Sequence, residues 1–122
     1  MLNFLNPRAG HGVMHMAAQE AIDAAGRDEI VLIDVRDGNE LAATGKAKGA
    51  IHLPLMSLRM KADPRSPECA PELKSSKPLV LYCATGARSH SAGVMLRQFG
   101  YEDVRNMGGI RDWAMAGGEL ER

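Results

Sequence analysis

The sequence is poor in aromatic side chains and has no net charge. One Trp, two Tyr and two Phe make up its aromatic set, so Leu, Ile, Val, Met and Ala must build most of the hydrophobic core. Fifteen basic residues balance fifteen acidic ones. That balance leaves no electrostatic footprint for nucleic acid or for a membrane surface, so we expect neither as a partner.

Long hydrophobic runs and metal-binding clusters are also missing from the sequence. No stretch approaches the about 18 apolar residues of a membrane-spanning helix, and the N-terminus lacks the pattern of an export signal. We therefore expect a cytoplasmic protein, in which thiols stay reduced. Cys69 and Cys83 have neither CxxC nor Cys/His ligand spacing, so we expect no metal or cofactor and at least one free thiol.

The length of 122 residues fits one domain with one core. We expect residues 1–122 to form that domain, with 1–12 as a loose lead-in. Apolar runs of strand length alternate with helical patterns along the chain. The strands are predicted at 30–35, 50–53, 79–82 and 103–106, and the helices at 18–25, 39–43, 88–99 and 110–116. This alternation predicts an α/β fold with a central, mainly parallel sheet of about five strands and helices on both faces.

The loop after the third predicted strand favours a reactive thiol. Ligands of parallel sheets bind beyond the carboxyl ends of the strands, where Cys83 stands, and Asp34 and Arg36 stand at another such end. Because the loop runs directly into a helix, its N–H groups and the helix dipole face the sulfur. Gly86 allows the turn, and Arg88 adds a positive charge or braces the loop. Together these features should lower the pKa of the thiol and create a nucleophile.

Four segments of the chain resemble the rhodanese family. Cys83-Ala-Thr-Gly-Ala-Arg88-Ser89 matches the family loop Cys-x-x-Gly-x-Arg-Ser, and Leu32-Ile-Asp-Val-Arg36, followed by Glu40, is similar to its first signature. The stretch 45–54 resembles Gly-His-Ile-x-Gly-Ala-x-x-x-Pro, with Lys46 where His is common. The stretch 104–109 with Trp113 is similar to the closing Gly-Gly-x-x-x-Trp pattern. The four segments occur in the family order and span residues 32–113.

The resemblance implies the rhodanese fold and a thiosulfate sulfurtransferase type of enzyme. Cys83 would take a sulfane sulfur from a thiosulfate-like or persulfide donor, hold it as a persulfide, and pass it to a thiol or to cyanide. The residues implied in binding the sulfur are those of the loop: Ala84, Thr85, Gly86, Ala87, Arg88 and Ser89. The resemblance also favours a structural ion pair for Asp34, with Arg36 adding positive potential.

Two other functions stay open on the sequence. The first is a sulfur relay between protein donors and acceptors with little thiosulfate turnover. The second is a cysteine phosphatase or an arsenate reductase; cysteine phosphatases of related fold use Cys-x5-Arg. Four residues separate Cys83 from Arg88, and this tighter loop suits one sulfur atom better than a tetrahedral oxyanion.

Three residues outside the loop are further candidates. Arg59 and Lys61 could attract an anionic donor. Cys69 could resolve the persulfide of Cys83 into a disulfide, or it could be an incidental thiol.

Overall fold

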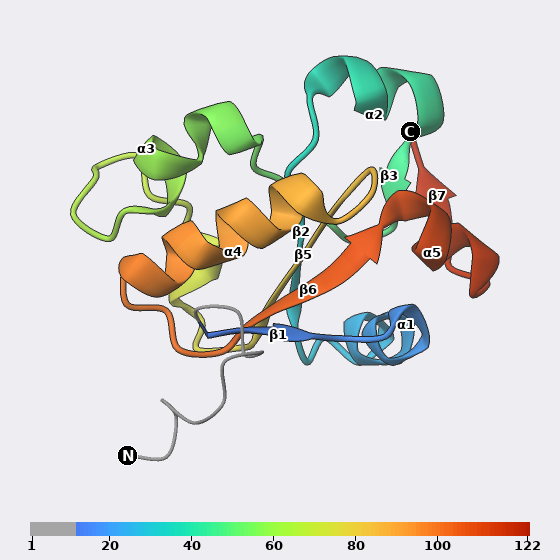
Figure 1. Ribbon diagram of the computed structural model, residues 1–122, viewed down its shortest axis with the longest axis horizontal. Coiled ribbons are helices and arrows are strands. Elements are labelled where there is room, and N and C mark those ends of the chain that lie inside the picture. The colour runs from blue at the N-terminus through green and yellow to red at the C-terminus, as the bar shows by residue number, and fades with distance from the viewer. Residues whose placement is uncertain (1–11) are drawn as a thin grey trace.

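A computed structural model describes residues 12–122, so the predicted lead-in lies outside the described residues except for Gly12, which stands in a turn. Helices cover both sides of a twisted sheet (Figure 1). The helices are α1 (Ala18–Gly26), α2 (Gly38–Thr44), α3 (Leu58–Ala62), α4 (Ala87–Gln98) and α5 (Ile110–Met115), with 3-10 turns at Leu55–Ser57 and Pro71–Lys74. The strands are β1 (Val13–His15), β2 (Val31–Asp34), β3 (Lys46–Ala47), β4 (Ile51–His52), β5 (Leu79–Cys83), β6 (Val104–Gly109) and β7 (Leu120–Glu121).

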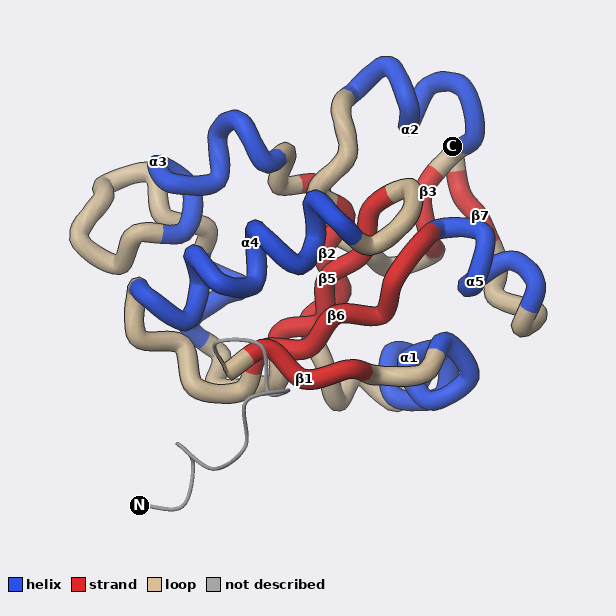
Figure 2. Tube along the Cα trace, in the orientation of Figure 1, coloured by secondary structure: helices blue, strands red, loops and turns tan. Residues whose placement is uncertain are grey.

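Five parallel strands form the central sheet in the order β1-β6-β5-β2-β4. Figure 2 shows them together at the centre of the molecule. The predicted α/β class with a parallel sheet of about five strands is confirmed. The sequence analysis missed β1 and the small antiparallel ribbon of β3 and β7. These strands have two or three residues each, too few to show a period of two.

The two central strands carry side chains for two separate cores. Every residue of β2 and β5 is buried, as expected for strands covered on both faces. Alternate residues of these strands, including Ile33, Leu81 and Cys83, join one core with residues of α3 and α4. The intervening residues, including Leu32, Val80 and Tyr82, join the other core with residues of α1 and α5. The thiol of Cys83 therefore lies on the α4 side of the sheet.

Helix α4 lies very close to the sheet. A Cβ atom at Gly93 would stand 2.9 Å from Cγ2 of Val13 and 3.3 Å from Cγ1 of Val104. Since a valine side chain is stiff, neither strand can yield easily. This close contact holds the middle of α4 against β1 and the start of β6.

Replacing Gly93 with Ala tests this packing. The added methyl overpacks the interface at a cost of about 1–3 kcal/mol, against a gain of about 1 kcal/mol in helix propensity. We expect the free energy of unfolding in urea to fall by up to about 2 kcal/mol. The control is Gly26→Ala, in α1, where an added Cβ has no neighbour within 4 Å, and it should leave stability unchanged or slightly higher. Equal stabilisation by both substitutions would contradict the close approach of α4.

Candidate active site

The backbone of the loop after β5 bends inward over the sulfur of Cys83. Gly86 adopts a φ of +109°, a left-handed conformation that side chains disfavour. Its N–H group donates to the Cys83 sulfur at 2.9 Å. Gly109, at the end of β6, makes room for the loop on its other side, because a Cβ there would lie 2.3 Å from the carbonyl oxygen of Ala84. Two glycines from two segments thus allow this shape.

Ser89 supplies two further donors to the same sulfur. Its backbone N–H lies 3.4 Å from the Cys83 sulfur and its hydroxyl 3.3 Å. Burial raises the pKa of the Cys83 thiol, but hydrogen bonds from the Ser89 hydroxyl and from the N–H groups of Ser89, Gly86 and Thr85 outweigh it, so the pKa is lowered overall. Cys83 is completely buried, so the loop favours a thiolate that bulk water does not solvate.

Asn106, on β6, braces the loop from the side. It was not among the site residues predicted from the sequence. Its amide nitrogen donates to the carbonyl oxygen of Gly86 at 3.0 Å. Its amide oxygen accepts from the Ser89 hydroxyl at 2.8 Å and from the N–H of Gly108 at 3.0 Å. A hydroxyl has one proton to give, so the Cys83 sulfur and Asn106 are alternative acceptors for Ser89. The only feature of the sequence that could have indicated this role was a polar residue directly before the Met-Gly-Gly segment.

Arg88 turns away from the sulfur and toward α2. Its two terminal nitrogens donate to the two carboxylate oxygens of Glu40 at 2.7 and 2.8 Å. Glu40 also accepts the N–H of Asp37 at 2.9 Å, at the start of α2. The hydrogen bonds from Arg88 hold the pKa of Glu40 at about 2, even though burial opposes them. Arg88 thus braces the loop, as one of the two sequence interpretations proposed, and its charge is offset.

Asp34 and Arg36 form a buried ion pair at the end of β2. The guanidinium of Arg36 donates to the Asp34 carboxylate at distances between 2.8 and 3.1 Å. Its remaining donors reach the Thr44 hydroxyl at 2.9 Å and the carbonyl oxygen of Gly45 at 2.7 Å. The pair therefore ties β2 to the end of α2, and the positive potential expected of Arg36 is cancelled by Asp34.

The remaining loop residues frame the entrance to the sulfur. Thr85 and Ala87 are exposed, and Ala84 is partly buried.

The other candidate residues lie far from Cys83. Arg59 stacks over the Phe99 ring at 6.0 Å, and the sulfur of Cys69 lies 3.6 Å from the Tyr101 hydroxyl. Phe99 and Tyr101 follow the last turn of α4, whereas Cys83 precedes its first turn, and a helix of 12 residues is about 18 Å long. Arg59 thus does not border the loop, and Cys69 cannot pair with Cys83 in this structure. Lys61 pairs with Glu68 instead.

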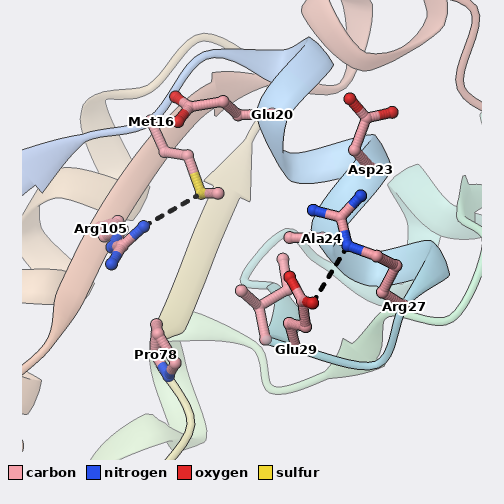
Figure 3. A pocket seen from close by; sticks show the side chains of 9 residues that line it. Met16, Glu20, Asp23, Ala24, Arg27, Glu29, Pro78 and Arg105 are labelled. Atoms are coloured by element: carbon pink, nitrogen blue, oxygen red, sulfur yellow. Dashed lines mark hydrogen bonds and ion pairs between the residues drawn. The ribbon is translucent and has the colours of Figure 1, made fainter.

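A charged pocket of about 300 Å³ lies at the end of the sheet opposite to Cys83 (Figure 3). Ile30 and Pro78, which precede β2 and β5, line it together with the Arg27–Glu29 pair. It opens at the amino ends of the strands and takes no part in the Cys83 site. Within residues 12–122 no group of three or more His, Cys, Asp or Glu could hold a metal ion, and no helix there could cross a membrane.

Comparison with known proteins assigns the family. Residues 17–116 match the Rhodanese-like domain. The chain belongs to this family. A sulfurtransferase of Allochromatium vinosum is 35% identical over 76% of this chain and 79% of its own length. The human single-domain sulfurtransferase has a TM-score of 0.67 and 29% identity, and the match covers 83% of this chain and 95% of the human one.

A third relative carries a different name. A protein of unknown function from Rhodopseudomonas palustris, described as a possible tyrosine phosphatase, has a TM-score of 0.84 and 31% identity, with 93% of this chain and 89% of that chain covered. Both solved structures share the overall fold of this chain. The family and the named sulfurtransferases support a rhodanese-like enzyme of the sulfurtransferase type.

Replacing Arg36 with Met should destabilise the rhodanese-like domain strongly. Asp34 is fully buried, and removing one partner of a buried ion pair costs about 3–5 kcal/mol because the other charge loses its compensation. We expect a decrease of that size in the free energy of unfolding, measured in urea. Arg27→Met, which breaks the exposed pair with Glu29, should leave the free energy of unfolding nearly unchanged, because exposed ion pairs contribute little to stability. Similar losses in both variants would show that the Asp34–Arg36 pair is not a buried support.

Replacing Ser89 with Ala should raise the pKa of Cys83. The substitution removes a hydroxyl donor 3.3 Å from the sulfur, and the thiolate loses the stabilisation that this hydrogen bond gives it. The pH dependence of alkylation by iodoacetamide measures this shift. Ser91→Ala, an exposed position in the same helix, should leave the profile unchanged. An unshifted profile in Ser89→Ala would mean that the hydroxyl serves Asn106 alone.

Proposed function

We propose that this rhodanese-like domain transfers a sulfane sulfur through a persulfide on Cys83. The observation that carries the proposal is the convergence of donors from Gly86 and Ser89 on one buried sulfur. Such donors stabilise negative charge without adding a full positive charge. They can serve the thiolate before transfer and the persulfide afterwards.

The first half-reaction loads the sulfur. The Cys83 thiolate attacks the outer sulfur of the donor, and the new S–S bond forms as the donor's own S–S bond breaks. The bonding electron pair leaves with a thiolate when the donor is a persulfide, or with sulfite when it is thiosulfate. Hydrogen bonds in the loop lower the pKa of Cys83 and so favour the thiolate that makes this attack.

The second half-reaction transfers the outer sulfur of the Cys83 persulfide to the acceptor. An acceptor thiolate or cyanide attacks the outer sulfur of the Cys83 persulfide, and the Cys83 sulfur leaves with the electron pair as a thiolate. The same N–H groups of Gly86 and Ser89 stabilise this leaving group. The scheme predicts ping-pong kinetics, since the donor residue departs before the acceptor reacts.

Phosphate-ester hydrolysis is the alternative favoured by the description of the Rhodopseudomonas palustris relative. Two features oppose it here. Four residues separate Cys83 from Arg88, and both terminal nitrogens of Arg88 are already bound by Glu40. A phosphatase would need that guanidinium to bind the phosphoryl oxygens.

Intact mass spectrometry tests the proposal. After incubation with glutathione persulfide, the wild-type protein should gain one sulfur atom that cyanide removes as thiocyanate. Cys83→Ser should gain none, because a hydroxyl cannot form the persulfide, and Cys69→Ser should behave as the wild type does. An equal gain in Cys83→Ser would refute the mechanism, and a loss confined to Cys69→Ser would move it to the other thiol. Cys83-dependent hydrolysis of p-nitrophenyl phosphate without sulfur loading would favour the phosphatase.

A further inference from the structure

The charges beside the Cys83 loop cancel in pairs. Arg88, within the loop, and Arg36 both act electrostatically on Glu40. Arg88 is bound bidentately by Glu40, and Arg36 is bound by Asp34 at 2.8 Å. Asp37 also faces this cluster and acts electrostatically on Arg88. Both of these guanidinium groups are therefore already compensated when an anion approaches.

Glu40 is held firmly in this arrangement. Its carboxylate completes the capping box at the start of α2 by accepting the N–H of Asp37. The far end of α2 is fixed by the bonds from Arg36 to Thr44 and Gly45. A donor that recruited Arg88 would thus have to break two short, charge-assisted hydrogen bonds. Because both side chains are about one-third exposed, solvent screens this pair only in part.

We propose that Glu40 determines the donor specificity of the site, disfavouring dianionic donors such as thiosulfate and favouring persulfides that carry a single negative charge. This inference rests on the proposed sulfur transfer through Cys83. Thiosulfate brings two negative charges to the thiolate and releases sulfite, which is also a dianion. A persulfide brings one charge and releases a thiolate with one charge, which neutral N–H and O–H donors can accommodate.

Two chemically matched donors isolate the effect of charge. Thiosulfate and methanethiosulfonate each transfer their outer sulfur to the Cys83 thiolate as one S–S bond forms and another breaks. The electron pair leaves with sulfite from the first and with methanesulfinate from the second, so no oxidant or reductant is required. The donors differ by one negative charge, and both produce the same Cys83 persulfide. Cyanolysis of that persulfide is common to both reactions.

The decisive variant is Glu40→Gln. Glutamine keeps an acceptor for the capping box, so α2 should persist while one negative charge is lost. Since the electrostatic energy scales with the charge of the donor, we expect kcat/KM to rise about tenfold for thiosulfate and about threefold for methanethiosulfonate. Any accompanying change in the pKa of Cys83 acts on both donors alike and cancels in their ratio. The larger gain for thiosulfate than for methanethiosulfonate in Glu40→Gln should shrink at high salt.

Two further variants make the test specific. Glu29→Gln removes the same charge from an exposed ion pair at the other end of the sheet, and it should leave the donor ratio unchanged. The double variant Glu40→Gln/Arg88→Gln has the net charge of the wild type, so its donor ratio should return to within about twofold of the wild-type value.

The outcomes separate this inference from the proposed function. Persulfide loading of Cys83 with an unchanged donor ratio in Glu40→Gln overturns the role of Glu40 and leaves sulfur transfer intact. A wild-type protein and a Glu40→Gln variant that load from glutathione persulfide but from neither matched donor also overturn it. Absence of loading from every donor overturns the proposed function itself.

Discussion

The buried guanidinium of Arg36 joins the end of the central sheet to the helix that carries Glu40. It binds Asp34 on its own strand end, reaches Thr44 and Gly45 at the end of α2, and lies 5.8 Å from the centre of the Tyr82 ring. Each residue of α2 is at least partly exposed, so hydrophobic burial contributes little to its position. Polar contacts place the helix instead, and Glu40 in turn places Arg88. A charge pair that never touches the sulfur therefore sets the shape of the loop around it.

The loop recognises sulfur mainly through backbone geometry. Gly86 and Gly109 allow the bend and the close approach of β6, and Asn106 holds both the carbonyl of Gly86 and the hydroxyl of Ser89. Because Ser89 can give its single proton either to Asn106 or to the sulfur, the site can strengthen its hold on a thiolate without moving its backbone. Under the proposed function, this adjustment accompanies each transfer, since negative charge shifts between the inner and the outer sulfur atom.

Local patterns made most of the fold and the central residue of the site predictable. The buried runs of β2 and β5 are continuous and apolar, and the Cys83–Ser89 loop is contiguous, so both are visible in the sequence. The short strands β1, β3 and β7 are not, because two or three residues carry no period. The pairing of Glu40 with Arg88 and the bracing by Asn106 join residues far apart in the chain. The charge of Arg88 was visible in the sequence, but its neutralisation depends on where α2 lies.

Because Arg88 is neutralised by Glu40, the groups that contact the Cys83 sulfur are neutral hydrogen-bond donors. A free guanidinium beside Cys83 would instead add a full positive charge, which favours donors of higher negative charge. Hydrogen bonds from Gly86 and Ser89 to a buried sulfur are weaker and can adjust. Arg88 still contributes, because its planar fork joins α4 to α2 with two fixed hydrogen bonds, a geometry that a lysine could not reproduce. Arg88 can therefore support the position of the loop while its charge is largely cancelled by Glu40.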